Sequence, residues 1–199
     1  EDFQVLEFTG TRFQTFNVDT AESTGIEIES QFLLTDDLTI SPAITWTDAK
    51  YPSDCATQDV TAVNYNLNAA TLCGNTLTNA PEIVAILGAD YSTQISSSGM
   101  TGFINGSVRY EDDRRTSTQA FDPATGVALV EDVQEANTKV DLRVGMTSPS
   151  GNWTMELWGK NITDERTKSV TFNIPLNVGA RGAFFQDPAM YGVTLRAKY

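Results

Sequence analysis

The chain has 199 residues, with 13 Lys and Arg against 26 Asp and Glu, no His, and a formal net charge of −13. This acidic balance argues against a nucleic-acid-binding protein, which needs a basic surface, and the lack of His excludes Ser-His-Asp and Cys-His catalysis. No run of about 18 apolar residues is present to form a transmembrane helix. One domain is expected at this length.

Strands are expected almost throughout, because apolar and polar side chains alternate along most of the chain. Ile26 and Ile28, for example, alternate with Glu27 and Glu29. The expected strands lie near residues 2–9 and at 25–34, 38–47, 81–94, 101–113, 138–147, 153–161 and 191–199.

The connections between these strands alternate between short and long. The short ones are 35–37, 95–100 and 148–152, and the long ones are 51–80, 114–135 and 162–188. Most of the strands exceed the five or six residues usual in soluble sheets. Long strands with short turns at one end and long loops at the other are typical of transmembrane barrels. The sequence therefore predicts an all-β fold, an antiparallel transmembrane β-barrel of about eight strands, with an apolar face toward lipid and a polar face toward a wet lumen.

A soluble sandwich or a lipocalin-like binding barrel is the competing interpretation, because alternation alone does not say which face is inside. Charges of both signs fall on neighbouring polar faces, which suits a hydrated barrel interior and a soluble surface equally well. Strand length and loop asymmetry favour the membrane barrel. The charged residues are Glu27, Glu29, Asp90, Arg109, Glu111, Asp141, Arg143, Glu156, Lys160, Arg196 and Lys198.

Two cysteines, Cys55 and Cys73, lie in the expected connection 51–80. Without a CxxC spacing or any His, a zinc site is disfavoured, and no cofactor is expected. A disulfide that closes a long loop in an oxidising compartment is the favoured interpretation. Two unpaired thiols are the alternative, because sequence does not show pairing.

The last nine residues carry the sharpest pattern. Apolar or aromatic residues occupy every second position, namely Tyr191, Val193, Leu195, Ala197 and Tyr199. We expect Val193 and Leu195 to face lipid, the final aromatic to lie at the membrane interface, and Arg196 to face the lumen. The pattern resembles the carboxy-terminal strand signal of bacterial outer-membrane proteins. An ordinary amphipathic strand that ends a soluble domain is the alternative.

Further segments narrow the resemblance. They are residues 17–29 (NVDTAESTGIEIE), 79–82 (NAPE) with 88–91 (GADY), 161–165 (NITDE) and 185–193 (FQDPAMYGV). In this order and spacing they resemble the C-terminal part of the β-barrel of TonB-dependent outer-membrane receptors. Each motif is weak alone, but together they cover nearly the whole chain.

This resemblance implies a 22-stranded barrel around an amino-terminal plug, located in the bacterial outer membrane. It implies import of a scarce nutrient, such as an iron-siderophore complex, with energy from TonB, and no enzymatic activity. Residues 1–199 would be the C-terminal barrel segment without the plug. The implied partners are membrane lipid, the rest of the barrel and its plug, TonB through the missing N-terminal part, and a small-molecule ligand. The alternative is a self-contained eight-stranded outer-membrane protein that serves as an adhesin, a structural protein or a lipid-modifying enzyme.

Recognition is expected on the long connections, because loops on a rigid scaffold carry binding residues. The candidate ligand-facing residues are the aromatic and arginine residues of these connections, namely Tyr51, Tyr65, Arg114, Arg115, Phe121, Arg181, Phe184 and Phe185. Arg114 and Arg115 suit an anionic chelate through charge-assisted hydrogen bonds. The alternative, which the sequence favours, is a solvated arginine pair that balances Asp112 and Asp113. Phe184 and Phe185 have the alternative role of packed loop or interface residues.

Overall fold

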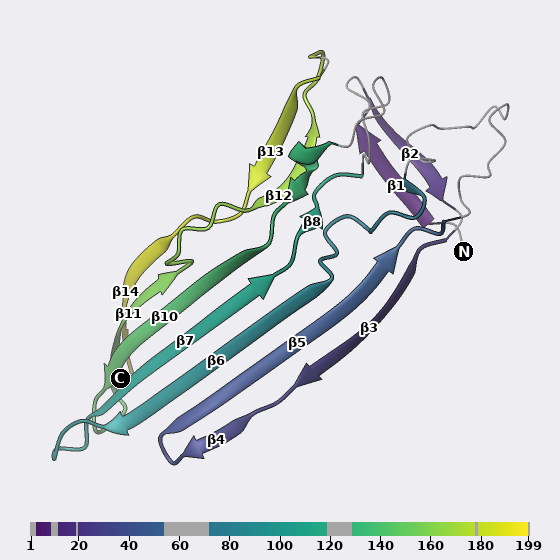
Figure 1. Cartoon of the computed structure of the whole chain (residues 1–199). Coiled ribbons are helices and arrows are strands. Elements are labelled where there is room, and N and C mark those ends of the chain that lie inside the picture. Colours follow the sequence, from purple (N-terminus) through teal and green to yellow (C-terminus); the bar gives the residue numbers. More distant parts are fainter. Residues whose placement is uncertain are drawn as a thin grey trace, which may run out of the picture.

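The computed structural model describes residues 3–8, 12–18, 20–53, 72–118, 129–177 and 179–198. Its main feature is one antiparallel sheet with the strand order β3-β5-β6-β7-β10-β11-β14, in which β4 also pairs with β5 (Figure 1). The strands are β3 (Glu22–Glu29), β4 (Phe32–Thr35), β5 (Leu38–Lys50), β6 (Ile83–Gln94), β7 (Thr101–Glu111), β10 (Asn137–Thr147), β11 (Trp153–Lys160) and β14 (Met190–Ala197). Because β3 and β4 both pair with β5, they form one interrupted edge strand. The described sheet is open, with edges at β3 and β14, as in part of a larger barrel.

Three two-stranded sheets lie apart from this wall. They are β1 (Phe3–Phe8) with β2 (Phe13–Val18), β8 (Arg114–Arg115) with β9 (Val133–Gln134), and β12 (Lys168–Asn173) with β13 (Arg181–Phe185). The strand expected near residues 2–9 therefore forms as β1, but it pairs with β2 outside the wall. The 3-10 helix η2 (Val130–Asp132) precedes β9. Within the described ranges no helix has the length and apolar character needed to cross a membrane.

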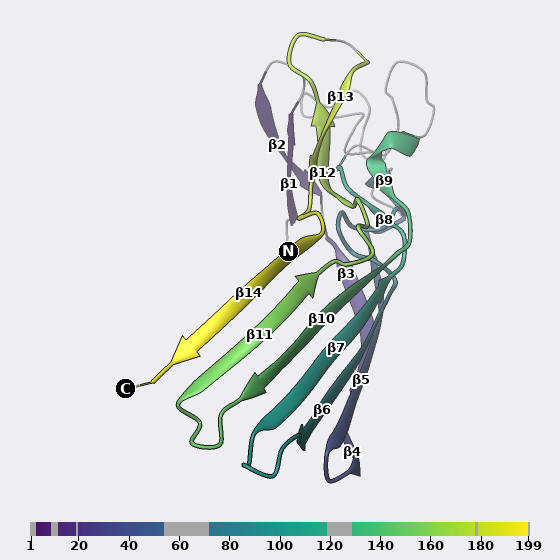
Figure 2. The same ribbon diagram turned by 90° about the vertical axis from the view of Figure 1, so that its left-hand side faces the viewer.

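The connections alternate as the sequence predicts. Short turns join β4 to β5, β6 to β7 and β10 to β11 at one end of the wall, which we call the turn end (Figure 1). Gly99 and Gly151 take φ values of +88° and +69° in two of these turns, a conformation that costs glycine little. Strands β5, β7 and β11 end, and β6, β10 and β14 begin, at the opposite end, which we call the loop end and which carries the small sheets (Figure 2).

One face of the wall carries a continuous band of exposed apolar side chains. Strand pairing places Tyr91 opposite Ile104, Ile104 opposite Val144, and Val144 opposite Leu157, which in turn lies opposite Val193. The buried apolar residues of the described chain are Val5, Ala49, Tyr51 and Leu72, none of which lies in the middle of the wall. Exposing such a band to water is unfavourable by about 25 cal/mol per Å². The band therefore fits an apolar surrounding medium.

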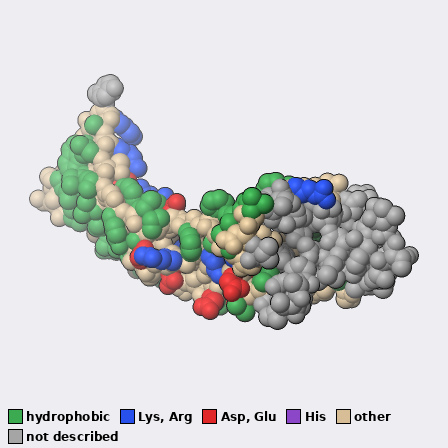
Figure 3. Space-filling view, turned by 90° about the horizontal axis from the view of Figure 1, so that it is seen from above, with side chains coloured by type: hydrophobic (Ala, Val, Ile, Leu, Met, Phe, Trp, Pro, Cys, Tyr) green, Lys and Arg blue, Asp and Glu red, His purple; other side chains and the backbone are tan. Residues whose placement is uncertain are grey.

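The opposite face, which we call the polar face, carries charges of both signs. Asn105 donates a hydrogen bond to Asp90 (2.5 Å) across β6 and β7. Glu156 accepts from Arg143 (2.7 Å) and from Arg196 (3.1 Å), and thereby joins β10, β11 and β14. At one end of the curved sheet, Figure 3 shows hydrophobic side chains along the outer flank and Lys and Arg side chains along the inner flank. The concave side of the wall is therefore the polar side.

Candidate functional site

A buried ion pair joins three chain segments at the loop end. Asp132 of η2 is fully buried, and Arg181 of β13 donates from Nε to its Oδ1 (3.1 Å) and from Nη2 to its Oδ2. Arg181 also donates to Ser117 Oγ (3.2 Å) and to Asn173 Oδ1. A two-pronged arginine–carboxylate contact fixes orientation as well as distance. Arg181 therefore holds the β12–β13 hairpin against the segments that carry Ser117 and Asp132.

Thr116 supplies a second set of links at the same place. Its backbone N–H donates to the carbonyl oxygen of Asp132 (2.7 Å), and its own carbonyl oxygen accepts from the N–H of Thr171 (2.9 Å). The hydroxyls of Thr116 and Thr171 also lie 2.9 Å apart. Because both threonines are buried, these bonds satisfy groups that have no water to bind. In its described part, the loop end is therefore a set of segments that the bonds of Arg181 and Thr116 link to one another, which we call the Arg181 framework.

Arg114, a candidate ligand contact, is buried in this framework. It forms an ion pair with Glu111 and donates to Asn79 Oδ1 (3.2 Å) and to the carbonyl oxygen of Lys168 (2.9 Å). The acidic partner of Arg114 is thus Glu111. The sequence had instead favoured a solvated arginine pair that balances Asp112 and Asp113, and for Arg114 this expectation was wrong. Burial lowers the pKa of the Arg114 guanidinium. The structure gives Arg114 a role in joining β7 to β12, and ligand contact by Arg114 stays a prediction.

Arg115 and Tyr51 lie close enough to influence each other electrostatically. Burial lowers the pKa of Arg115, and the negative charges of Asp132 and ionised Tyr51 act in the opposite direction. Burial raises the pKa of Tyr51, against the effect of the Arg115 charge. Tyr51 packs with Val5 and Leu72 in the apolar cluster of the loop end. Arg115 is therefore a half-buried cation beside a small apolar core.

Of the remaining candidate residues, only some lie in the part of the chain that the structure describes. Phe184 and Phe185 are exposed in β13, and the Phe184 ring centroid lies 5.2 Å from that of Phe172. Three further candidates and the final aromatic lie outside the described residues, namely Tyr65, Phe121, Cys55 and Tyr199. Phe184 and Phe185 therefore offer aromatic surface at the loop end, and the expectations for the four residues outside the described ranges stay predictions.

Cys73 packs against the cluster of Val5, Tyr51 and Leu72. We expect Cys55 and Cys73 to form a disulfide, which would tie the connection after β5 to this cluster by closing a loop. Counting free thiols on the unreduced, denatured protein should give none, and two after reduction. Two reactive thiols before reduction would contradict the pairing.

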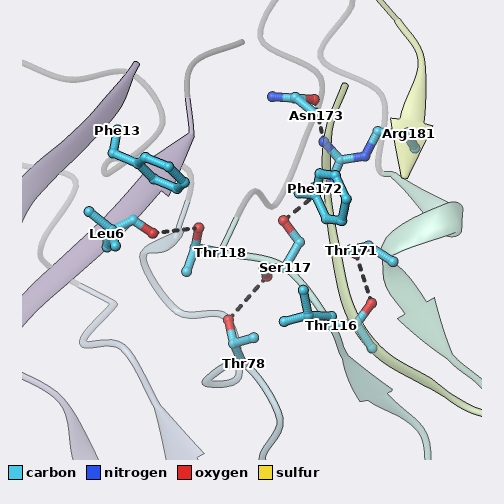
Figure 4. A pocket seen from close by; sticks show the side chains of 11 residues that line it. Leu6, Phe13, Thr78, Thr116, Ser117, Thr118, Thr171, Phe172, Asn173 and Arg181 are labelled. Atoms are coloured by element: carbon cyan, nitrogen blue, oxygen red, sulfur yellow. Dashed lines mark hydrogen bonds between the residues drawn. The ribbon is translucent and has the colours of Figure 1, made fainter. Parts of the chain in front are cut away.

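A pocket of about 230 Å³ opens beside the Arg181 framework (Figure 4). Its apolar wall comes from Leu6, Phe13, Val170 and Phe172, and its polar rim from Thr78, Thr116, Ser117, Thr118, Thr171, Asn173 and Arg181. Thr78 donates to the carbonyl oxygen of Ser117 (3.1 Å), which fixes part of this rim. Sequence reasoning singled out Arg181 but missed the pocket, because the lining residues come from four distant segments and share no local motif. The pocket therefore combines an apolar wall with a rim of hydrogen-bonding groups.

The terminal strand has the expected alternation in its described part. Tyr191, Val193 and Leu195 are exposed on the apolar face of β14. Arg196 lies on the other face, where it binds Glu156. Arg196 is therefore one of the two cations that neutralise this carboxylate.

The wall has the features of a transmembrane β-barrel, namely an apolar band on one face, a polar concave face, short turns at one end and long connections at the other. The sequence matches the family described as TonB dependent receptor-like, beta-barrel over residues 1–162, and the chain belongs to this family. It is therefore part of a protein of the Gram-negative outer membrane, and its family consists of receptors rather than enzymes.

Three solved structures are similar to this chain. The ferric yersiniabactin uptake receptor FyuA from Yersinia pestis has a TM-score of 0.69 at 13% identity over 94% of this chain and 25% of FyuA. The ferric preacinetobactin receptor BauA from Acinetobacter baumannii has a TM-score of 0.61 at 12% identity, over 98% of this chain and 25% of BauA. The siderophore receptor PiuA from Acinetobacter baumannii has a TM-score of 0.57 at 15% identity, over 88% of this chain and 21% of PiuA. No curated protein matches the sequence. The chain thus spans about a quarter of the length of these receptors or less.

Proposed function

We propose that residues 1–199 form the C-terminal barrel segment of a receptor that imports a ferric siderophore or a similar large ligand with energy from TonB. The plug and the contact with TonB belong to other parts of the receptor. The observation that carries the proposal is the tied loop end, where Asp132 and Arg181 hold a pocket and exposed aromatic side chains above a lipid-facing wall. The ligand class is supported by the three similar structures, which are a ferric yersiniabactin uptake receptor, a ferric preacinetobactin receptor and a siderophore receptor.

In this proposal the described part of the segment contributes to capture. Phe13 lines the pocket and, like Phe185, is exposed. Aromatic side chains offer a large contact area at a small loss of conformational entropy. The Asp132–Arg181 pair keeps the pocket walls in place before the ligand arrives, which lowers the entropic cost of binding. Phe184, Arg114, Arg115 and Tyr65 remain proposed ligand contacts.

Uptake by cells tests the proposal directly. A strain that lacks the receptor gene should lose accumulation of at least one member of a panel of ⁵⁵Fe-loaded hydroxamate, catecholate and mixed siderophores. The complete gene should restore accumulation in cells with TonB and fail to restore it in cells without TonB. Uptake that is the same with and without the receptor for every member of the panel would reject a role in iron-siderophore import.

Siderophore binding by single variants tests whether exposed aromatic residues of the loop end contact the ligand. We expect Phe13→Ala or Phe185→Ala to weaken binding of the transported siderophore about tenfold, since loss of a central aromatic contact costs roughly 1.4 kcal/mol or more. Leu33→Ala is the matched control, because Leu33 is also an exposed apolar residue but lies near the turn end. Fluorescence titration of the purified full-length receptor measures all three. Equal affinities for Phe13→Ala, Phe185→Ala and the control would remove both aromatic residues from the ligand site.

A further inference from the structure

Charge is unevenly distributed across the polar face of the wall. Near the β14 edge, Arg143 and Arg196 both pair with a single carboxylate, Glu156, and Lys198 follows directly after β14, so these four side chains carry a net charge of +2. The backbone N–H of Lys198 donates to the carbonyl oxygen of Asn152 (2.8 Å), which continues the β11–β14 pairing by one residue, so Lys198 shares the side of Arg196, two residues earlier. At the β3 edge, Glu27 and Glu29 lie opposite the uncharged Thr45 and Ala43. The polar face thus changes from negative to positive between its two edges.

The arginines near the β14 edge have more N–H donors than they use in binding Glu156. Glu156 is 3% exposed, whereas the side chains of Arg143 and Arg196 are 48% and 58% exposed. Each guanidinium has five N–H donors, and each gives one hydrogen bond to Glu156. The two arginines therefore neutralise the buried carboxylate and still present donors to the concave side. We call Arg143, Arg196 and Lys198 the basic patch.

The lumen of a barrel as large as the one proposed is filled by protein. A segment that covers the basic patch removes water from it, and a desolvated charge without a partner is costly. Complementary charge on the covering segment removes this cost and also fixes its orientation. The patch therefore favours a carboxylate-bearing occupant, and Glu27 and Glu29 disfavour the same occupant at the other edge.

We infer that the basic patch docks an acidic polypeptide segment inside the barrel, with one or more Asp or Glu side chains bound to Arg143, Arg196 and Lys198. The inference rests on the proposed function, because the occupant belongs to the part of the receptor that fills the lumen. It adds the location and the sign of charge of that contact. The segment is held at the β10–β11–β14 side of the wall.

Zero-length carbodiimide coupling of the purified full-length receptor tests this docking, because the reagent joins an amine to a carboxylate within ion-pair distance. Peptide mass spectrometry should find Lys198 joined to an Asp or Glu outside residues 1–199. Arg196→Gln should lower the yield of this product at least threefold. Arg109→Gln is the matched control and should leave the yield unchanged, because Arg109 is on the polar face of β7 and pairs with Glu111.

The pair of Lys50 and Asp48, whose charged atoms lie 2.9 Å apart, is the internal control for coupling. The inference is overturned if the Lys50–Asp48 pair couples but Lys198 stays unmodified. It is equally overturned if Lys198 couples only to a residue within 1–199 or to lipopolysaccharide. It is also overturned if Arg196→Gln and Arg109→Gln give the same yield. The siderophore uptake assay reads out import independently, so failure of uptake with retained Lys198 coupling would reject the ligand class and keep the docking site.

Discussion

Replacing Asp132 by Ala should release the β12–β13 hairpin from the loop end. The variant leaves the Arg181 guanidinium, whose side chain is 11% exposed, without its carboxylate. Breaking a buried ion pair from one side costs about 3–5 kcal/mol, because a desolvated charge loses its counter-ion. Amide hydrogen exchange in residues 168–173 and 181–185 should accelerate by about a hundredfold or more, since each 1.4 kcal/mol corresponds to a factor of ten.

Glu131→Ala is the control for this experiment. Glu131 is the neighbour of Asp132 in η2, and its side chain is exposed. Its backbone carbonyl accepts from Lys168 Nζ (2.8 Å), a bond that the substitution keeps. We expect hydrogen exchange in the hairpin to stay near wild type in this variant. Equal protection in the two variants would show that the Asp132–Arg181 pair does not hold the hairpin.

Asp132 and Arg181 also show why the loop end was not predictable from sequence. They lie 49 residues apart, and neither belongs to a motif that marks an ion pair. Thr116 and Thr171 likewise meet across 55 residues through hydroxyls that have no periodic pattern. Pairing of this kind depends on how the connections fold over the wall. The alternation of side chains along a strand carries no information about it.

The wall itself was predictable because its cause is local. In β14, Tyr191, Val193 and Leu195 alternate with Thr194 and Arg196, and this period of two fixes which face each residue occupies once the strand forms. The short turns were equally visible, since Gly99 and Gly151 mark positions that need positive φ. The pairing of β1 with β2 was not visible, because alternation predicts a strand but does not name its partner.

Arg114 shows the limit of reasoning from neighbours in sequence. Its nearest acidic neighbours are Asp112 and Asp113, yet its ion-pair partner is Glu111. The guanidinium also reaches Asn79 and the carbonyl oxygen of Lys168, two groups far away in the chain. A long side chain selects partners by the geometry of the fold, so adjacency in sequence gave the wrong partner.

The orientation of the wall leads to the second large expected effect. Val108 and Ser107 are adjacent in β7, at nearly the same depth, but on opposite faces. Val108 lies between Leu87 and Val140 on the apolar face, whereas Ser107 lies between Gly88 and Asp141 on the polar face. Val108 lies on the apolar face between the exposed side chains of Ile104 and Tyr110, so we expect it in the membrane interior, where an arginine facing lipid costs about 2–4 kcal/mol because the charge loses its hydration. On the polar face the same arginine meets water and the carboxylate of Asp141.

Val108→Arg should therefore lower the free energy of unfolding of the full-length barrel by about 2–4 kcal/mol, and Ser107→Arg by less than about 1 kcal/mol. Urea titration of the receptor folded into phosphatidylcholine vesicles measures both values under the same conditions. The two variants introduce the same side chain one residue apart, so a difference between them reports the face and not the general effect of an added charge. Equal losses, or a larger loss for Ser107→Arg, would contradict the assignment of the apolar face to lipid.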